Sequence, residues 1–430
     1  MIFSLDVIRA RKGDCLILHY GSKDDPHLVM IDGGPSGVYV PHLRNRLEQI
    51  RSSRGLDDQE PLVVDLLMVS HVDDDHINGI LDLMQELRHA ADTQSPPLVS
   101  VLLGVWHNSF ENIIKDTPSH VEAAFDAKFP TASTQGELPD DWTLDSSEDE
   151  ETVRSSLKVL QSIKQGAQLR EDVDRLELGL NPFFNVGESL IVAEGENSVP
   201  MDNGLTFTVA GPMRPELEKL RKKHQEWLKE LKAEGKTPSD VLAAYVDKSV
   251  PNLSSIVVLA QVEDKTMLLT GDALGSKVME GLELVGAMPK GGTLHVDILK
   301  APHHGSSNNL ALDFFQQITA DHYVFSGNGE HGNPERESLE MLLEARGDDD
   351  YKVHLTYPIE EIDPARIVAW KKEQKRDEQL GRPIRPDWNP EEQSLTTFLQ
   401  ENPKFAEKIR IVPDGEPHLI NLLEEVVSEV

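Results

Sequence analysis

The stretch His71-Val72-Asp73-Asp74-Asp75-His76 directly follows Ser70 and the apolar run at residues 63–69. That run, Val-Val-Asp-Leu-Leu-Met-Val, is typical of a strand that is covered on both faces. Five of the next six side chains are imidazoles or carboxylates, which bind Zn²⁺, Mn²⁺ and Fe ions. Because the end of a strand holds side chains rigidly, the stretch predicts a metal site at the edge of a sheet. The alternative is a solvated acidic turn with incidental histidines.

The composition limits the class of protein. A chain of 430 residues, 38% of them apolar, is long enough for two or three domains, or for one large α/β domain with insertions. No apolar run has transmembrane length, and the first residues lack the pattern of a signal peptide. The single cysteine, Cys15, cannot form an internal disulfide, which fits a reducing compartment. We therefore expect a cytoplasmic protein that does not associate with a membrane.

The charge of the chain bears on its substrate. There are 75 acidic and 42 basic residues, which gives a formal net charge of −33. Affinity for duplex DNA comes from Lys and Arg side chains that displace counterions, so most of this surface repels a duplex. A local basic groove is still compatible with the composition.

The hydropathy pattern predicts an α/β protein. The predicted strands cover residues 5–8, 15–19, 28–31, 62–69, 99–105, 205–209, 255–261, 266–270, 296–300 and 322–326. The predicted helices cover residues 40–51, 77–89, 153–178 and 214–233. We expect a core formed by residues 1–110 and 200–355, a partly mobile, helical insertion at 111–199, and a less regular C-terminal extension at 356–430.

Four segments share one pattern, in which an apolar strand leads into a short loop that offers His or Asp. They end at His71–His76, at His107, at Asp272 and at the pair His303 and His304. Strands of one sheet end side by side, so these side chains are expected to converge on one cleft. An aspartate is suited to bridge two cations, and two metal ions can hold a water-derived nucleophile between them.

These segments resemble the motifs of the metallo-β-lactamase superfamily. The family's second motif reads His-x-His-x-Asp-His, whereas residues 71–76 read His-x-Asp-x-Asp-His. This variant is similar to the metallo-hydrolase domain of ComEC-type competence proteins. The stretches that match that domain, in order, are residues 13–16, 31–34, 70–79, 252–255, 268–272 and 299–306. The resemblance implies a four-layer αβ/βα sandwich with two mixed sheets face to face, and metals at one edge, where the sheet ends meet.

The resemblance also implies a ligand set for two divalent metal ions, zinc or manganese. His71 and Asp73 would bind one ion, Asp75 and His76 the other, and Asp272 would bridge them. His107 would complete the first site, although a capping or surface histidine is an equal alternative there. His304 would close the second site, and His303 would then lie near the substrate or support a ligand.

Other residues keep two interpretations. Lys300 could contact an anionic substrate or point to solvent, and Ser306 and Ser307 could bind a phosphate or cap a helix. His331 lies in a glycine-rich segment that resembles a family segment in which His directly precedes Pro; here two residues intervene, and a role in substrate binding is one interpretation. Asp32 is expected to support the metal loop by hydrogen bonding, and Cys15 to be a core residue.

The implied function is metal-dependent hydrolysis by metal-bound hydroxide, with Asp75 and His303 as catalytic residues. A phosphodiester in a nucleic acid or nucleotide is the leading substrate, so the protein would be a phosphodiesterase or nuclease, and the charge favours single strands or small molecules over a duplex. The first alternative is hydrolysis of a lactone, thioester or amide. The second is a partner-dependent subunit, for example of a bacterial defence complex, with residues 111–199 or 356–430 as the partner-binding surface.

Overall fold

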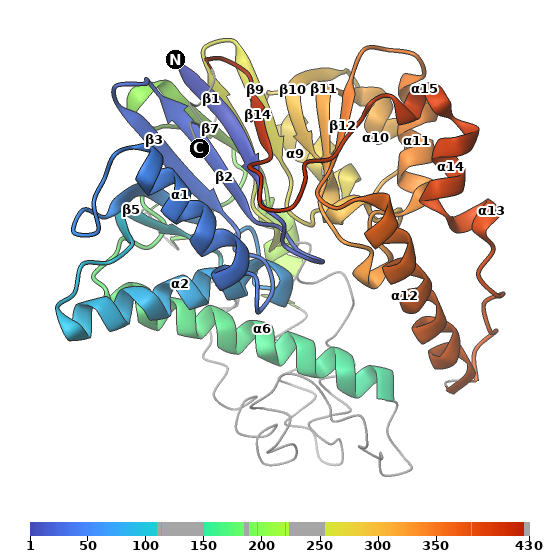
Figure 1. Cartoon of the computed structure of the whole chain (residues 1–430), viewed down its shortest axis with the longest axis horizontal. Helices are drawn as coiled ribbons and strands as arrows, with labels where there is room; N and C mark the ends of the chain where they lie inside the picture. Colours follow the sequence, from blue (N-terminus) through green and yellow to red (C-terminus); the bar gives the residue numbers. More distant parts are fainter. Residues whose placement is uncertain are drawn as a thin grey trace.

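A computed structural model describes residues 1–109, 113, 150–184, 189–195, 197–219, 221–222, 254–379 and 381–424. Two β-sheets pack face to face, and helices cover the outer face of each (Figure 1). The architecture is a mixed α/β sandwich, as the sequence predicts. Among the described residues, no helix combines the length and the apolar character needed to cross a membrane.

The first sheet has the strand order β14-β1-β2-β3-β4-β5. Strands β14, β1, β2 and β3 are antiparallel neighbours, whereas β3, β4 and β5 run parallel. Its strands are β1 (Ile2–Val7), β2 (Leu16–Gly21), β3 (Pro26–Ile31), β4 (Leu62–Met68), β5 (Val99–Trp106) and β14 (Leu419–Asn421).

The second sheet has the strand order β13-β12-β11-β10-β9-β8-β7-β6. Strands β6 to β9 are antiparallel neighbours, and β9 to β13 run parallel. Its strands are β6 (Ser198–Pro200), β7 (Leu205–Gly211), β8 (Val257–Val262), β9 (Lys265–Leu269), β10 (Leu294–Lys300), β11 (Ile318–Phe325), β12 (Lys352–Leu355) and β13 (Ile409–Arg410).

The core between the sheets explains the apolar run that precedes the metal motif. Leu66 and Met68 of β4 point into the space between the two sheets, where they join side chains of the second sheet such as Phe207. Val64 and Leu67 of the same strand point the other way, into the core under the helices. Because both faces of β4 are covered, nearly every position in it is apolar.

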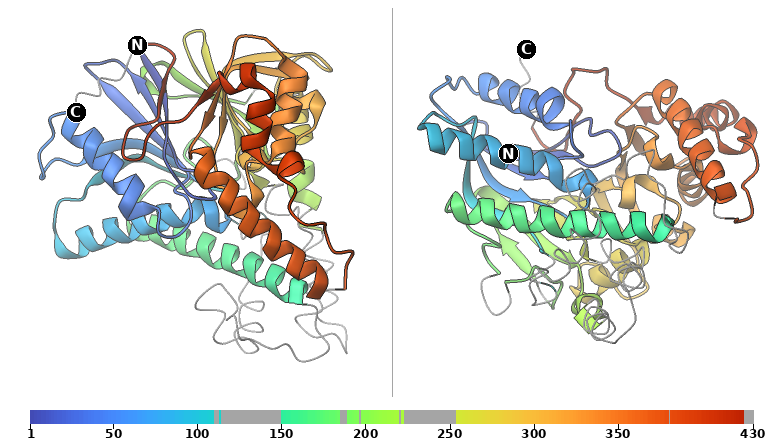
Figure 2. Two further views of the ribbon diagram at one scale, coloured as in Figure 1. Left: turned by 45° about the vertical axis from the view of Figure 1, so that its right-hand side comes forward. Right: turned by 90° about the horizontal axis from the view of Figure 1, so that it is seen from below.

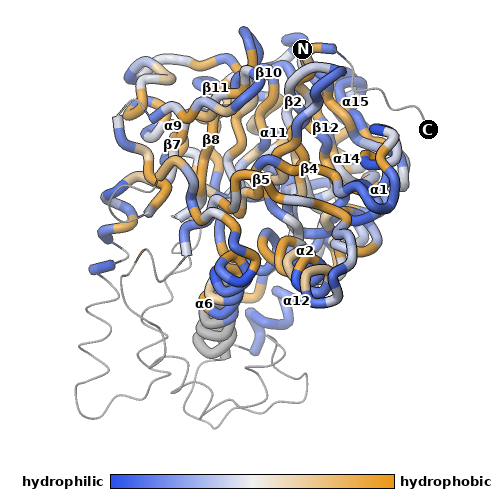
Figure 3. Tube along the Cα trace, turned by 90° about the vertical axis from the view of Figure 1, so that its left-hand side faces the viewer, coloured by the Kyte–Doolittle hydropathy of each residue, from blue (hydrophilic) through white to orange (hydrophobic). Residues whose placement is uncertain are grey.

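The helices of the first sheet lie on its outer face. They are the π-helix η1 (Tyr39–Arg44), α1 (Asn45–Ser53), α2 (Asp74–Thr93) and α6 (Glu150–Arg175). The predicted helix at residues 40–51 is therefore divided between η1 and α1. Helix α6 packs along α2 (Figures 1 and 2). Figure 3 shows β4 and β5 as largely hydrophobic, while the outer helices carry many hydrophilic residues.

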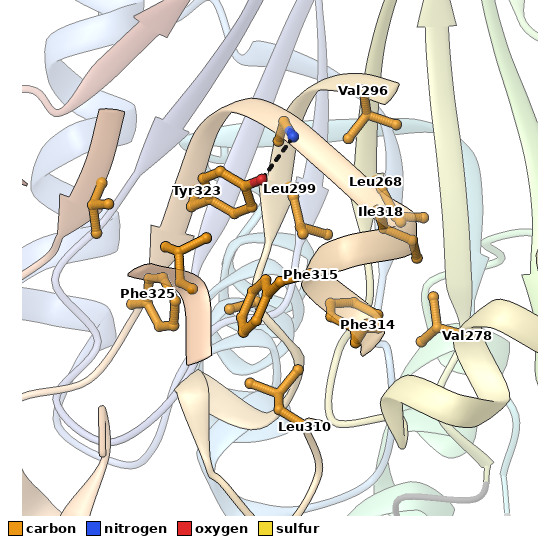
Figure 4. Close-up of a cluster of buried hydrophobic side chains, with 14 of the residues drawn as sticks. Leu268, Val278, Val296, Leu299, Leu310, Phe314, Phe315, Ile318, Tyr323 and Phe325 are labelled. Carbon is orange, nitrogen blue, oxygen red and sulfur yellow. Dashed lines mark hydrogen bonds between the residues drawn. The ribbon is translucent and has the colours of Figure 1, made fainter. Parts of the chain in front are cut away.

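A third core lies between the second sheet and its own helices. Phe314 and Phe315 of α10 pack against Leu299 and Ile318 (Figure 4). Tyr323 reaches into the same cluster, and its hydroxyl accepts a hydrogen bond of 2.9 Å from the backbone amide of Ala320. The helices of this side are α9 (Gly275–Leu284), α10 (Leu312–Gln317), α11 (Arg336–Arg346), α12 (Ile359–Gln379), α13 (Pro390–Gln393), α14 (Leu395–Glu401) and α15 (Pro403–Ala406).

The C-terminal residues are more regular than the sequence indicates. The described part of 356–424 forms α12 to α15 and also supplies β13 and β14, one strand at an edge of each sheet. The expectation of an irregular segment is therefore wrong, because strands of two or three residues are too short to show a periodic pattern. Residues 114–149 of the predicted insertion, which was expected to be partly mobile, lie outside the described residues, as does the part of the predicted helix at 214–233 beyond residue 222.

Two glycines allow the loop after β3 to touch the start of α2. A Cβ atom on Gly79 would lie 2.0 Å from the carbonyl oxygen of Gly33, and one on Gly33 would lie 2.4 Å from the backbone nitrogen of Ile80. No larger residue fits at either position without moving the backbone. This contact fixes the Asp32 loop beside the metal motif, and it explains why both motifs contain glycine.

Candidate metal centre

Four loops bring acidic and histidine side chains to one edge of the sandwich. The loop after β4 carries His71 to His76, and the loop after β9 carries Asp272. The loop after β10 includes the 3₁₀-helix η4 (Pro302–Gly305), which carries His303 and His304. Asp14 comes from the loop between β1 and β2. The side chains of Asp14, His76, Asp272 and His304 lie close enough to hold one metal ion, with donor atoms all within 4.8 Å of one another.

Asp272 divides the histidines of this centre into two pairs. Its Oδ1 atom lies 3.2 Å from Nε2 of His76 and 3.5 Å from Nε2 of His304. Its Oδ2 atom lies 3.4 Å from Nε2 of His303 and 3.7 Å from Nε2 of His71. The two oxygens of one buried carboxylate thus face two different pairs of imidazoles.

Two further carboxylates divide in the same way. Asp75 lies with the first pair, with its Oδ1 4.0 Å from Nε2 of His76 and its Oδ2 3.8 Å from Nε2 of His304. Asp73 lies with the second pair, with its Oδ2 3.8 Å from Nε2 of His71. Each side of Asp272 therefore has two imidazoles and at least one additional carboxylate.

The other ring nitrogen of each histidine has a hydrogen-bonding partner, which fixes the orientation of the ring. The Nδ1 atoms pair as follows: His76 with Asp32 at 2.8 Å, His304 with Ser326 at 2.9 Å, His303 with Asn309 at 2.8 Å, and His71 with Ser70 at 3.2 Å. Such partners are usual around metal-binding histidines, since they leave the other nitrogen free to bind the ion. All four Nε2 atoms are directed towards Asp272.

The unpaired atoms at the centre fit a divalent cation. The Nε2 atoms of His71, His76 and His304 and the Oδ1 atom of Asp272 are buried, and no hydrogen bond within the described residues satisfies them. Leaving buried polar atoms unpaired costs about 1–3 kcal/mol each. A bound divalent ion would satisfy all of them, because neutral imidazoles and carboxylates are its usual ligands.

The buried histidines and aspartates of the centre shift one another's pKa values. Burial, together with the nearby His76, lowers the pKa of His71 to about 4, so this ring is neutral at pH 7. Burial and the neighbouring Asp75 and Asp272 raise the pKa of Asp73 to about 7. Burial opposes the charge on Asp272, but His303, His304 and His76 outweigh it and hold the pKa of this carboxyl well below its usual range. The central aspartate is therefore an anion.

The backbone supports the centre in unusual conformations. His303, His304 and Asp32 all have positive φ, at 47°, 55° and 60°. Few residues other than glycine adopt this region, and such strain is often found at functional sites. The two consecutive left-handed histidines turn both imidazoles of η4 towards Asp272.

Asp32 supports the loop that carries the metal motif, and this prediction is confirmed. Its carboxylate accepts hydrogen bonds from the backbone amide of Ser70 at 2.7 Å, from the Ser70 hydroxyl at 2.6 Å and from Nδ1 of His76 at 2.8 Å. Cys15 is buried in the core under the helices, as expected.

The proposed first-site ligand His107 stays a prediction. The ring is fully buried, both ring nitrogens lack a hydrogen-bond partner among the described residues, and burial lowers its pKa to about 3. The interpretation as a surface histidine is therefore wrong. No ion pair links His107 to a described carboxylate of the centre, whereas His303 lies 3.4 Å from Asp272. His303 thus lies directly against Asp272, whereas the sequence analysis expects it near the substrate or in support of a ligand.

Lys300 neither points to solvent nor lies open to a substrate. It is 1% exposed, and its Nζ atom is 2.8 Å from Oδ2 of Asp14 and donates a hydrogen bond of 3.0 Å to the carbonyl of Ala301. Asp14 in turn hydrogen-bonds Ser326 and lies 3.2 Å from Nδ1 of His304. Burial opposes the charge on Asp14, but Lys300 and His304 outweigh it and lower its pKa.

Of the remaining candidates, Ser306 is buried and His331 is exposed in the 3₁₀-helix η5 (Glu330–Gly332). Neither Ser306 nor Ser307 caps α10, whose N-cap residue is Ala311. Sequence reasoning missed Asp14 as a member of the centre. The signal was its place in the stretch 13–16, where Gly13 approaches the metal motif so closely that a Cβ atom would lie 1.9 Å from the carbonyl oxygen of Asp75.

The fold and the centre define a two-sheet α/β protein with a buried His/Asp cluster that fits a divalent metal. No protein-family model matches the sequence. Over 119 residues, 27% of the chain, it is 30% identical to the microtubule-associated protein futsch of Drosophila melanogaster. Over 113 residues, 26% of the chain, it is 28% identical to microtubule-associated protein 1A of Homo sapiens. These matches cover 2% and 4% of those proteins, so the chain corresponds to only a small part of either relative.

Among solved structures, a protein of Parabacteroides distasonis, provisionally assigned as a metal-dependent hydrolase, aligns with 81% of this chain and with 97% of its own length. The TM-score is 0.30 and the sequence identity 9%, so the similarity is loose. The interpretation of the centre therefore depends on its own geometry.

Proposed function

We propose that this protein is a hydrolase with two divalent metal ions, of the metallo-β-lactamase type, and that it cleaves phosphodiester bonds. The observation that carries the proposal is the division of four imidazoles between the two oxygens of Asp272. A carboxylate that bridges two ions needs separate ligands on each side. His76, His304, Asp14 and Asp75 would hold one ion, and His71, Asp73 and His303 would contribute to the other.

Two ions bound here would lower the pKa of a coordinated water and stabilise charge on a phosphoryl or carbonyl oxygen. Zinc and manganese both suit the mixture of imidazole and carboxylate ligands. In the proposed fold, the matching stretches 13–16, 31–34, 70–79, 268–272 and 299–306 all meet at this edge of the sandwich. These are five of the six stretches that carry the sequence resemblance, and their proximity supports the proposal.

The centre has one open side, which we propose faces the substrate. The side chains of His71, His76 and Asp272 are at most 3% exposed. In contrast, the side chains of Asp73 and His303 are both 31% exposed. The side chain of Asp75 is 23% exposed. A substrate would therefore approach past these three residues.

The exposed residues have distinct roles in this proposal. Asp75 would orient the attacking water and accept its proton, because its carboxylate lies between His76 and His304 and remains accessible. His303, whose Nδ1 is held by Asn309, would present Nε2 on the open side. On the Asp73 side, Ser162 of α6 donates a hydrogen bond of 3.1 Å to that carboxylate, so the insertion contributes to the wall of the site.

The test is hydrolysis of bis-(p-nitrophenyl) phosphate by protein loaded with zinc or manganese, compared for wild type and Asp75→Ala. Asp24→Ala is the matched control, because Asp24 is exposed in the turn between β2 and β3. Turnover that depends on metal and is lost only in Asp75→Ala supports the proposal. If the metal-loaded protein leaves this substrate intact but hydrolyses a lactone or thioester, the phosphodiesterase proposal is wrong.

A cytoplasmic location and a protein partner that binds residues 111–199 or 356–430 remain proposals. A partner-dependent enzyme would bind metal in the isolated state and hydrolyse substrate only after the partner is added. Copurification from a native extract, followed by the same assay, tests this.

A further inference from the structure

We propose that the arm formed by α12 and the returning residues 381–389 binds single-stranded nucleic acid and guides it to the metal centre. The role of the arm in guiding a substrate rests on the proposed phosphodiesterase function, whereas the binding experiment described below does not depend on that function. In the rest of this subsection, "the arm" means residues 359–389. Helix α12 and the returning segment extend away from the sheets on the same side as α6 (Figures 1 and 2).

The arm begins beside the metal centre. Nε of Arg366 donates a hydrogen bond of 3.0 Å to the carbonyl of Gly332 in η5, the helix that follows β11. The same loop after β11 begins with Ser326, which hydrogen-bonds the ring of His304. The loop is also tied to the strand that precedes the arm, because the amide of Gly327 donates to the hydroxyl of Thr356. One short segment thus connects the base of the arm to a residue of the centre.

The arm has a defined structure of its own. Nε1 of Trp370 donates a hydrogen bond of 2.9 Å to the carbonyl of Pro386, and the Trp370 and Trp388 rings meet edge to face at 5.8 Å. The guanidinium of Arg385 lies 5.3 Å from the centre of the Trp370 ring. These contacts hold the returning segment along α12. The arm can therefore present its side chains in fixed positions.

The arm as a whole carries seven Lys and Arg side chains against seven Asp and Glu, and its excess of basic residues is confined to the part that follows the first turns of α12. Residues 366–388 carry seven Lys and Arg side chains against four Asp and Glu, in a chain with a net charge of −33. Arg376 and Arg385 are partly neutralised by ion pairs with Glu373 and Asp377. Lys371, Lys372 and Lys375 are exposed, and no ion pair with a described residue engages them. These three ammonium groups are available to an external anion.

The three lysines lie on one face of α12. Their spacing, together with Val368, is three, four and seven residues, which places them on one stripe of an α-helix. Val368 is 68% exposed, so the stripe combines an apolar side chain with three positive charges. From the first residue of α12 to Lys375 the helix rises about 24 Å, at about 1.5 Å per residue. The stripe itself, from Val368 to Lys375, accounts for about 10 Å of that rise, so a phosphodiester chain bound along it would lead from the outer half of the arm towards the centre.

A single strand fits this surface better than a duplex. The three lysines form one narrow stripe, whereas a duplex would also meet other surfaces of a chain whose net charge is −33. Proteins that bind single strands without sequence preference combine basic side chains along the backbone path with apolar or aromatic contacts to the bases. Val368 and the exposed Ile384 of the returning segment can supply the apolar contacts.

The experiment measures binding of a fluorescent single strand of about 20 nucleotides by anisotropy, using metal-free full-length protein so that nothing is cleaved. The variant is the triple substitution K371E, K372E and K375E. The matched control is K23E, K290E and K404E, which changes the charge equally. Lys23 lies in the β2–β3 turn, Lys290 before β10 and Lys404 beside the start of β12, all at the end of the sheets opposite to the centre.

We expect wild type and control to bind alike, and the arm variant to bind at least about tenfold more weakly. The slope of log K against log salt should also fall by about 2 in the arm variant, since each lost phosphate contact of a single strand accounts for about 0.7. Circular dichroism and the melting temperature establish that all three proteins are folded. Absence of binding by wild type, or equal loss in both variants, would overturn the proposal.

The two proposals fail separately. If bis-(p-nitrophenyl) phosphate is hydrolysed but the strand does not bind the arm, the enzyme acts on small phosphodiesters and the arm proposal is wrong. If the strand binds through the arm but no phosphodiester is cleaved with either metal, the arm proposal stands and the proposed hydrolase function is wrong.

Discussion

Among the residues that the structure describes, two clusters of histidines differ in whether their arrangement fits a metal ion. In the metal centre, each of four imidazoles has its Nδ1 occupied by a neighbour and its Nε2 directed at Asp272. In the second cluster, which we call the histidine ladder, His322, His354 and His418 use their ring nitrogens on one another. Nδ1 of His322 pairs with Nε2 of His354, and Nδ1 of His354 with Nε2 of His418, both at 2.9 Å.

The comparison shows that a cluster of histidines fits a metal ion when ring nitrogens and carboxylate oxygens remain without hydrogen-bond partners. The ladder satisfies His354 completely, and no carboxylate takes part in its ring-to-ring bonds. The centre leaves Nε2 atoms and a carboxylate oxygen without partners in the interior. A divalent ion would satisfy the centre, whereas the ladder needs only neutral rings. The following predictions test this difference, from the largest expected effect to the smallest.

The largest effect is expected from Asp272→Ala. This change removes both oxygens that divide the imidazoles, so we expect hydrolysis to fall by on the order of 10³-fold or more, because several kcal/mol of charge stabilisation is lost. Metal content measured by mass spectrometry should also fall below that of wild type. His354→Asn, in the ladder, should keep the metal content of wild type. Equal metal loss in both variants would contradict the distinction between the clusters.

Metal binding should stabilise the fold through the centre alone. At an ion concentration 100 times the dissociation constant, binding to the native state adds about 2.7 kcal/mol to the free energy of unfolding. We expect a chelator to lower the melting temperature of wild type and of His354→Asn, but not that of Asp272→Ala. A chelator effect that persists in Asp272→Ala would place the ion elsewhere.

Asp32→Asn tests whether the contact between Asp32 and Nδ1 of His76 holds the His76 ring in position to bind metal. Asparagine tolerates the positive φ of 60° at this position, so the backbone should be kept. It carries no charge to hold His76, and such supporting partners usually account for about 10- to 100-fold in metal affinity. Titration with a metal-sensitive dye measures the change. An affinity equal to that of wild type would show that the Asp32–His76 contact does not orient the ligand.

The last prediction is a dependence of stability on pH that comes from the ladder. Burial, followed by the neighbouring histidines, lowers the pKa of His354 to about 2, and burial lowers that of His418 to about 4. Their unfolded pKa is about 6.5, so below that pH the unfolded chain binds protons that the folded chain cannot accept. Stability is therefore lost as the pH falls from about 6.5 to 5, by about 2 kcal/mol for each histidine.

Urea unfolding of wild type and His354→Gln at pH 7 and pH 5 measures this contribution. The variant should lose about 2 kcal/mol less than wild type between the two pH values, because one titrating ring has been removed. The same loss in both proteins would show that the ladder does not titrate as proposed.

The sequence predicts most of the centre because its residues follow strands with clear hydropathy patterns. The loops after β4, β9 and β10 were each expected to deliver ligands, and the structure brings Asp272, His304 and the 71–76 stretch together. Asp14 could not be assigned a role from pattern alone, because it follows a turn and its partners Lys300 and His304 are almost 300 residues away. Lys300 was misinterpreted because a charged residue at a strand end usually faces solvent.

The fold was predictable to the same extent. Long apolar strands and amphipathic helices were recognised, because their periodicity extends over several residues. The edge strands β13 and β14, with two and three residues, have no such periodicity and are stabilised by neighbours far away in the sequence. Their existence depends on the rest of the sheets, which no local pattern describes.

The position of β14 has a consequence for synthesis of the chain. β14 pairs with β1, and the side chain of Ser4 hydrogen-bonds Asn421 at 2.7 Å. While the ribosome is still translating, β1 is an exposed edge whose partner has not yet been made, and exposed edges favour association between chains. β1 therefore emerges about 400 residues before its partner β14, and a nascent chain stalled before residue 419 would present an unpaired strand to its neighbours on a polysome.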